Sequence, residues 1–183
     1  MSSRMREHIL SVASDLFSSQ GINATSVDKI VAKAQIAKVT LYNHFKTKEI
    51  LIVEYLRDQD SKLWSKFGSK SHAEDGMAEL HSFVNEIFDY IADKDFKGFA
   101  SINAAVEFPE TEHIVNQTSK ELSKQLRTRL IELAEKAGIK NADALALQLQ
   151  FIIEGASISN HSERNPETIE PAKAMAKILI NSH

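Results

Sequence analysis

The segment over residues 25–48 restricts the fold of this chain more than any other, because it predicts two short helices joined by a tight turn. In the second helix, over residues 37–44 and followed by Phe45, Leu41 and Phe45 are four residues apart and share one side. The opposite side carries amine, hydroxyl and imidazole groups. A polar helix on a small apolar base is the arrangement that reads base edges in the major groove of DNA. The segment therefore predicts a helix-turn-helix and sequence-specific DNA binding.

The charges of the chain are unevenly distributed. Its net charge is −3 at pH 7, but residues 1–48 contain seven Lys or Arg and three Asp or Glu, so this part carries +4 and the remainder −7. A basic N-terminal quarter on an acidic body favours a nucleic-acid surface near the N-terminus. Short segments also vary in charge by a few units without any function, so the charge pattern supports the motif but does not replace it.

The composition excludes several other classes of protein. The 183 residues contain no cysteine, which excludes a disulfide framework and a metal site built on thiolates. An apolar content of 43% is enough for a sizeable core. The polar start over residues 1–6 lacks the apolar run of a signal peptide, and no stretch reaches transmembrane length. We therefore expect a cytoplasmic protein that does not bind membranes.

The spacing of apolar residues predicts an all-α fold. The chain has only 3 prolines and 6 glycines, and no segment alternates with period two between turn residues. Helices are expected over residues 3–20, from 25 to the tight turn, and over 37–44, 48–67, 74–92, 96–107, 111–137, 142–160 and 165–180, with a break at 68–71. We expect a three-helix DNA-binding domain over residues 1–48 and a helical bundle over residues 49–183.

Single residues predict where several helices begin and end. Gly21 suits a left-handed cap after the first helix. Thr25 resembles the N-cap of the second helix, with Asp28 three residues later completing a capping box. Thr47 is expected to cap the helix over 48–67. Pro109 is expected to end the helix over 96–107, because the residue before a proline avoids helical angles.

The helix expected over residues 142–160 is apolar on almost every side. Such a helix is buried, either in the core of one chain or at an interface between chains. Both interpretations fit the sequence of this helix. The helix-turn-helix favours the second, because proteins of this kind usually dimerise to read two half-sites of a palindrome. We therefore expect a homodimer formed through the helices over 142–160 and 165–180.

Two stretches of the N-terminal domain resemble the tetracycline-repressor (TetR) family of transcriptional regulators. Residues 21–30 read Gly-Ile-Asn-Ala-Thr-Ser-Val-Asp-Lys-Ile, and residues 41–51 read Leu-Tyr-Asn-His-Phe-Lys-Thr-Lys-Glu-Ile-Leu. The family pattern there includes Leu-Tyr-x-His-Phe-x-Ser/Thr-Lys-Glu-x-Leu. The resemblance is specific over residues 5–52. Beyond them the helices match the family in number and length only, apart from Asn-Ala-Ala-Val-Glu-Phe-Pro at 103–109.

Three positions in the turn and the second short helix depart from that pattern. Gln35 stands where glycine is usual, which predicts a left-handed residue at a cost of about 1 kcal/mol. Ala37 replaces a serine, which removes an N-cap hydroxyl worth about 1 kcal/mol and one phosphate contact. Val39, often glycine, places an apolar group where a thymine methyl is available. These changes bear on which operator is bound rather than on the mechanism.

The resemblance implies a set of DNA contacts around the two short helices. A phosphate at the start of the second helix would be bound with help from the helix dipole. The predicted contacts are Thr25, Ser26, Lys38, Val39, Thr40, Tyr42, Asn43, His44, Lys46 and Lys48. Other roles fit several of these residues equally simply: capping for the first two, a solvated surface for Lys38, and packing for Tyr42.

The resemblance also implies that the part over residues 49–183 binds a small-molecule effector and dimerises, with no cofactor. An effector that favours a different spacing of the two DNA-binding domains would lower DNA affinity. The candidate effector contacts are Trp64, His81, Phe88, Phe99, Asn103, Glu107, Phe108, His113 and Gln117. Asn103 and Glu107 are the strongest, because polar groups on an apolar helix need partners if they are buried. A plain core position is the alternative for every aromatic residue.

Other function classes have weaker support in the sequence. General acid–base catalysis through Glu107 and His113 would make an enzyme, but no nucleophile motif or phosphate loop accompanies them. The histidines lack metal-ligand spacing, so no metal site is expected. A helical interaction protein without DNA binding would not need the polar groups of the second short helix. The prediction is a DNA-binding repressor released by an unknown effector; an activator remains the alternative.

Overall fold

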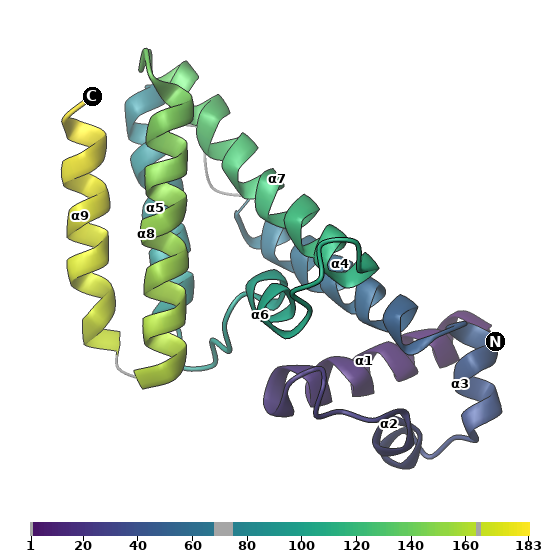
Figure 1. Cartoon of the computed structure of the whole chain (residues 1–183). Helices are drawn as coiled ribbons and strands as arrows, with labels where there is room; N and C mark the ends of the chain where they lie inside the picture. Colours follow the sequence, from purple (N-terminus) through teal and green to yellow (C-terminus); the bar gives the residue numbers. More distant parts are fainter. Residues whose placement is uncertain (1, 68–74, 164–165) are drawn as a thin grey trace. The chain divides into compact units, whose positions relative to one another are not determined.

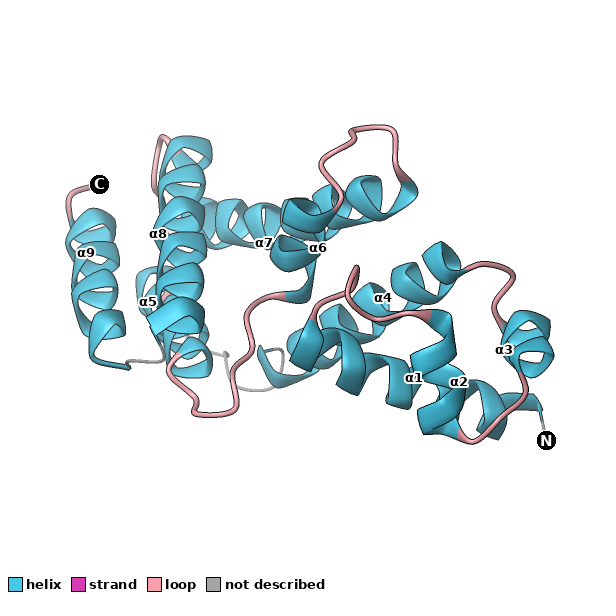
Figure 2. Cartoon of the chain, turned by 60° about the horizontal axis from the view of Figure 1, so that its bottom comes forward, coloured by secondary structure: helices cyan, strands magenta, loops and turns pink. Residues whose placement is uncertain are grey.

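A computed structural model describes residues 2–67, 75–163 and 166–183 of the chain. Every regular element in these ranges is a helix, and no strand occurs among them, as the all-α prediction requires (Figures 1 and 2). The expected break at residues 68–71 and the expected start of a helix at residue 74 lie outside the described residues. None of the helices in the described ranges is long and apolar enough to cross a membrane.

The chain forms two compact units, each of which is built from two separate segments of the sequence. The head unit contains Met1–Ser61 and Ala100–Leu122, and the bundle unit contains Lys62–Phe99 and Ser123–His183. Two long helices, α4 (Lys48–Phe67) and α7 (Ile114–Lys136), contribute residues to both units. The predicted boundary after residue 48 does not coincide with the limits of these compact units, and it stays a prediction.

The head unit is built around the first three helices. These are α1 (Ser2–Gln20), α2 (Val27–Ala34) and α3 (Lys38–His44), which lie together in Figure 1. The apolar stripe of α1 packs with Leu41 and Phe45, which are both fully buried. Ala104 of α6 (Ala100–Glu107) and Val115 of α7 belong to the same core. The head unit therefore includes a helix that is far from the helix-turn-helix in sequence.

The bundle unit has its core between α5 (Gly76–Ile91), α8 (Ala142–Glu163) and α9 (Ile169–Asn181), which follows a short 3-10 helix at Pro166–Thr168. These three α-helices pack against one another (Figure 1). Apolar residues of α5 recur every three or four positions, so they form one buried stripe. The stripe includes Leu80, Phe83, Val84, Ile87, Phe88 and Ile91.

Some helices begin later than the apolar pattern predicts. We expected a helix over 96–107, but α6 begins at Ala100. The side chain of Asp93 accepts a hydrogen bond from Asp95 N (2.8 Å), and its carbonyl accepts one from Phe96 N (2.9 Å). Gly98 then has a φ of 85°. These turns hold the backbone outside helical geometry, which local apolar spacing does not reveal.

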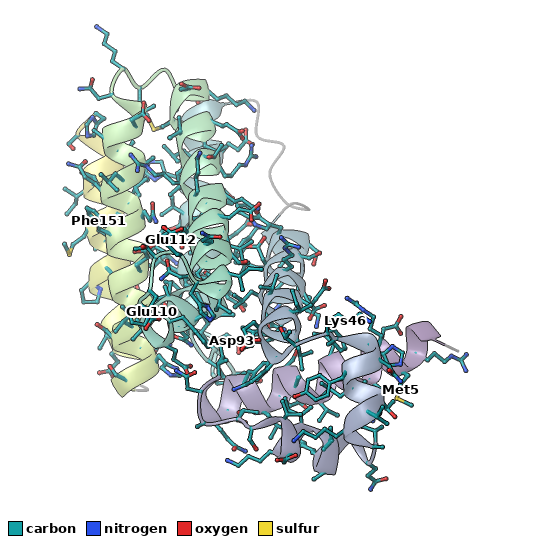
Figure 3. All side chains as sticks on the ribbon, turned by 45° about the vertical axis from the view of Figure 1, so that its right-hand side comes forward. Met5, Lys46, Asp93, Glu110, Glu112 and Phe151 are labelled. Atoms are coloured by element: carbon teal, nitrogen blue, oxygen red, sulfur yellow. The ribbon has the colours of Figure 1, made fainter. Side chains whose placement is uncertain are left out.

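Helix α8 is both a core helix and a source of exposed apolar surface. Its residues Leu145, Leu149 and Ile153 are fully buried in the bundle unit. Phe151, which points away from the helix in Figure 3, is 62% exposed, and Ile158 is 55% exposed. The core interpretation of this helix is therefore confirmed for its buried face, and the interface interpretation stays a prediction for its exposed face.

Candidate nucleic-acid interface

The turn between α2 and α3 is closed by a Schellman motif. Gln35 has the predicted left-handed conformation, with φ 55° and ψ 44°. Its N–H donates to Ala32 O (3.3 Å), and the N–H of Ile36 donates to Val31 O (3.1 Å). Ala37 follows at the N-cap of α3 without any side-chain cap, as its sequence predicts. The helix-turn-helix thus keeps its geometry with glutamine at a position that favours glycine.

Ser26, rather than Thr25, caps α2. The Ser26 hydroxyl accepts a hydrogen bond from Lys29 N (3.2 Å). Thr25 is fully buried, and its hydroxyl donates to Gly21 O at 2.7 Å. The predicted capping box with Asp28 is therefore wrong, and the buried Thr25 side chain is not placed for the phosphate contact expected of it. Ser26 remains the predicted phosphate contact at this helix start.

The polar residues of α3 form one exposed face. Leu41 and Phe45 point into the core of the head unit, which turns Val39, Tyr42 and Asn43 outward. Val39 is 65% exposed and Tyr42 is 38% exposed. Single exposed apolar residues are common on protein surfaces, so the exposure of Val39 and Tyr42 does not by itself identify a partner. The face carries the side chains that direct readout of a major groove requires.

The remaining predicted contacts of α3 lie at the edges of this face. Thr40 and His44 are half-buried. Lys38 is exposed, and its amine lies 2.9 Å from Asp28 of α2. The hydrogen bond to Asp28, followed by that carboxylate's charge, raises the pKa of Lys38 above its usual value. Exposed ion pairs of this kind contribute little to stability, so Lys38 remains available to a phosphate.

Most cations of the first 48 residues already have a partner within the head unit. The pairs are Arg6 with Glu54, Lys33 with Asp15, Lys38 with Asp28, Lys29 with Ala24 O, and Lys48 with Ile22 O. Among the described residues, Arg4 and Lys46 have no such partner. Lys46 is exposed between α3 and α4, where Figure 3 labels it. It is therefore the lysine best placed to bind a phosphate beside α3.

Lys48 has a contact within the head unit that its sequence position does not reveal. Its ammonium group donates to Ile22 O at 2.9 Å, and the side chain is half-buried. Burial lowers the pKa of Lys48, although the charge of Glu107 opposes that shift. The structure therefore gives Lys48 a contact with the turn between α1 and α2, and we expect this contact to replace the predicted phosphate contact.

Contacts from α1 that the sequence does not reveal also support α3. The guanidinium of Arg6 lies over the ring of Phe45, 4.8 Å from its centroid, and bonds to Glu54 at 2.9 Å. His8 Nε2 hydrogen-bonds to Ala34 O at the end of α2 (3.1 Å). The basic character of residues 1–48 favoured a nucleic-acid surface, and it did not reveal Phe45 as a partner of Arg6.

A family model of bacterial regulatory proteins, the tetR family, matches residues 9–55. This range covers most of α1, all of α2 and α3, and the start of α4, which are the elements that form the interface. The chain belongs to the TetR family. It is a transcriptional regulator, and TetR-family members are DNA-binding transcription factors rather than enzymes.

The similarity to TetR-family regulators extends over the whole chain. It is 26% identical over 190 residues to the HTH-type transcriptional regulator QacR of Staphylococcus aureus, covering 97% of each chain. It is 30% identical over 141 residues to the HTH-type transcriptional repressor KstR2 of Rhodococcus jostii, covering 74% of this chain and 66% of that one. A solved TetR-family regulator from Streptomyces coelicolor gives a TM-score of 0.91 at 25% identity, covering 98% of this chain and 96% of that one.

Four of the predicted effector contacts of this TetR-family chain belong to the bundle unit. Trp64 stacks on Phe83, with ring centroids 6.3 Å apart. Phe99 contacts other rings of the same unit and is half-buried. Phe88 is fully buried in the core, and His81 Nε2 hydrogen-bonds to Asn181 Oδ1 at 2.9 Å. Trp64, Phe99 and His81 therefore stay predicted effector contacts, whereas Phe88 lies in the core of the bundle unit.

The other candidates belong to the head unit. Both carboxylate oxygens of Glu107 accept hydrogen bonds from the turn after α1. His113 Nδ1 accepts one from Val115 N (3.2 Å), and its ring stacks on Phe108 with centroids 4.8 Å apart. Asn103 is half-buried and Gln117 is exposed. Glu107, one of the two strongest candidates from the sequence, thus has backbone amides as partners for both carboxylate oxygens.

No group of three or more His, Cys, Asp or Glu residues in the described ranges is arranged to hold a metal ion. The pairing of Glu107 and His113 as an acid and a base also lacks support, because each has a structural partner.

Substitution of Lys46 and of Lys48 should have different effects on DNA binding. We expect Lys46→Ala to weaken binding to every DNA sequence and to reduce the slope of log affinity against log salt by about 1 for each bound protomer, because each loses one phosphate contact. Lys48→Ala should leave that slope unchanged. The measurement is fluorescence anisotropy with labelled duplexes between low and moderate salt. A reduced slope for Lys48→Ala and not for Lys46→Ala would contradict the assignment.

Proposed function

We propose that this TetR-family regulator is a homodimeric repressor that binds a palindromic operator in the bacterial cytoplasm and is released by a small-molecule effector. The exposed face of α3, with Val39, Tyr42 and Asn43, is the observation that carries the proposal. The buried anchors Leu41 and Phe45 hold this face outward. One of its relatives is named as a repressor, which supports repression rather than activation.

Exposed apolar residues of the bundle unit support the dimer. Phe151 and Ile158 are seven residues apart on α8, so they share one face of that helix. Met175 and Ile178 are exposed on α9, which packs beside α8. An apolar surface on two neighbouring helices suits a two-fold interface in which each helix pair meets its copy. A dimer of this kind would present two copies of α3 to half-sites about one helical turn apart.

The dimer predicts a solution mass of twice the 20.5 kDa of the chain at micromolar concentration. Phe151→Asp should shift the mass towards the monomer, because a carboxylate would be buried without a partner at the interface. Val39→Asp is the matched control. It introduces the same carboxylate at an exposed apolar residue of α3 and should leave the mass unchanged. Light scattering after size exclusion measures both. A monomeric mass for the unaltered protein would contradict the dimer.

The effector part of the proposal is supported by Trp64. Its Nε1 is buried and has no hydrogen-bond partner among the described residues. A buried indole N–H without a partner is unfavourable, and such groups usually find an acceptor. The ring lies against Phe83, which contacts Phe67 at 6.0 Å, so aromatic surface adjoins the free donor. An effector that combines an apolar body with a hydrogen-bond acceptor fits this environment.

Selection of binding sites from random double-stranded DNA tests the proposed function. The purified full-length protein is used, and the bound fraction is sequenced after several rounds. We expect enrichment of a palindrome whose half-sites are centred about 10 base pairs, one turn, apart. Absence of any enriched sequence, with only weak and salt-sensitive binding, would contradict operator recognition. The position of the enriched site relative to promoters then distinguishes a repressor from an activator.

A further inference from the structure

The turn between α1 and α2 is bound by a carboxylate from a distant part of the chain. Glu107 Oε1 accepts a hydrogen bond from Ile22 N (2.9 Å), and Oε2 accepts one from Asn23 N (2.6 Å). The side chain of Asn23 donates back to Glu107 O at 3.0 Å. Three hydrogen bonds therefore join residues more than 80 positions apart, all within the head unit. We call this set of bonds the Glu107–turn contact.

The backbone of the turn is shaped to receive an anion. Gly21 has a φ of 88°, and its own N–H bonds to Phe17 O (3.0 Å). Consecutive N–H groups after a left-handed residue point in one direction and form a small anion-binding concavity. A Cβ added to Gly21 would lie 3.4 Å from Glu107 Oε1, so the carboxylate already fills the space beside it. Hydrogen bonds from amides to a charged carboxylate are stronger than neutral ones.

The other polar side of the same turn is bound by a cation. Lys48, the first residue of α4, donates to Ile22 O at 2.9 Å. The amide and the carbonyl of Ile22 are thus each held by a charged group, from α6 and from α4. The opposite charges also attract each other, since Glu107 opposes the lowering of the pKa of Lys48. The turn is therefore held from two helices at once.

Hydrogen bonds also join this turn to the residues that precede α2. Thr25 N donates to Ile22 O (3.2 Å), and the Thr25 hydroxyl donates to Gly21 O (2.7 Å). Ser26, the next residue, caps α2. A displacement of Ile22 and Asn23 would therefore move the first turn of α2 and the α3 helix packed against it, instead of being absorbed by a loose loop.

We infer that Glu107 is a positioning residue for DNA recognition, which holds the helix-turn-helix in its reading orientation through the turn between α1 and α2. This inference rests on the proposed function. Glu107 is the last residue of α6, so a movement of α6 would be transmitted to α2 through the same three bonds. A purely structural role would instead lower stability and leave the operator affinity of the folded protein unchanged.

Glu107→Gln in the full-length protein tests the inference. A glutamine amide keeps one acceptor oxygen but turns an NH₂ group towards a backbone N–H, so one bond is lost. We expect operator affinity to fall about tenfold or more, measured by anisotropy well below the unfolding midpoint. Affinity for unrelated DNA and the slope against salt should stay the same, because no phosphate contact is removed. Hydrogen exchange at the Ile22 and Asn23 amides should become faster.

Glu110→Gln is the matched control. Glu110 is exposed in the segment after α6, where Figure 3 labels it, and the substitution makes the same change of charge. It should alter neither operator affinity nor exchange at the turn. If Glu107→Gln fails to fold, Asn23→Ala removes only the third bond and should produce a smaller loss of operator affinity in the same direction.

Two results would overturn the inference. Faster exchange at Ile22 and Asn23 with unchanged operator affinity would make the Glu107–turn contact a stabilising contact only. Unchanged exchange would show that the contact does not order the turn. If the unaltered protein enriches no DNA sequence, the proposed function fails and the inference fails with it, whereas the exchange data still report whether Glu107 binds the turn.

Discussion

Tyr42→Ala will abolish specific operator binding while the helical circular dichroism and the unfolding midpoint stay those of the unaltered protein. Tyr42 is 38% exposed on α3 and lies outside the core of the head unit, so its removal creates no cavity. Surface substitutions of this kind change stability by about 0.5 kcal/mol or less. Loss of one base or phosphate contact in each half-site, at about 1–3 kcal/mol for each contact, lowers affinity by about 100-fold or more, which removes the preference for the operator. Anisotropy with the selected operator measures the loss.

Tyr42→Phe separates the two contributions of this side chain. It keeps the ring and removes only the hydroxyl, so it should lose less affinity than Tyr42→Ala if the ring packs on a base or sugar. Unchanged affinity for Tyr42→Ala, in a protein that still enriches an operator, would show that α3 does not read DNA through this face. The proposed interface would then have to be abandoned.

Phe88→Ala will destabilise the protein by about 3–5 kcal/mol, which is the usual cost of deleting a buried aromatic side chain. Phe88 is fully buried in the core of the bundle unit, among the apolar residues of α5. In a chain of this length the unfolding midpoint should fall on the order of 10 °C. Thermal unfolding followed by circular dichroism measures the change.

Phe88→Leu serves as the control, because it retains most of the buried volume and should cost clearly less. The sequence alone proposed Phe88 as an effector contact, and the two roles predict different results. A midpoint within about 1 °C of the unaltered protein, together with a change in effector response, would contradict the core position and restore the earlier interpretation.

Much of the fold was readable from the sequence because it depends on neighbours along the chain. The apolar spacing of α1 and α5 marks their buried stripes, and both stripes lie in the core. Thr47 caps α4, with its hydroxyl accepting from Ile50 N at 3.2 Å. Gln35 adopts the left-handed conformation that its place in the turn requires. Each of these features follows from backbone geometry within a few residues.

Errors in the predicted helix ends also have local causes, but these were ambiguous. Thr25 and Ser26 are both good N-caps, and only the burial of Thr25 against Gly21 O decides between them. Asp93 and Gly98 delay the start of α6, although the apolar residues after them continue a helical pattern. Helix propensity and apolar spacing allow more than one residue as the start of each helix, and tertiary packing selects one of them.

The predicted site also has one part that the sequence predicts and another part that it does not. The face of α3 was predictable, because Leu41 and Phe45 determine by their spacing which side chains point outward. The partner of Glu107 was not predictable, since the sequence shows that a carboxylate on an apolar helix needs donors but not which donors. Its contacts with Ile22 and Asn23 depend on how α6 packs beside α1, more than 80 residues away.

The sequence by itself therefore determined the helical class, the helix-turn-helix and the face that α3 exposes, because these follow from periodicity and local backbone rules. Only the tertiary structure decided which charged groups have partners within the head unit. It leaves Lys46 exposed and directs Lys48 and Glu107 to the turn after α1. A charged side chain bonds to whatever partner the packed helices bring within reach, and that partner is set by distances across the core, which no local pattern encodes.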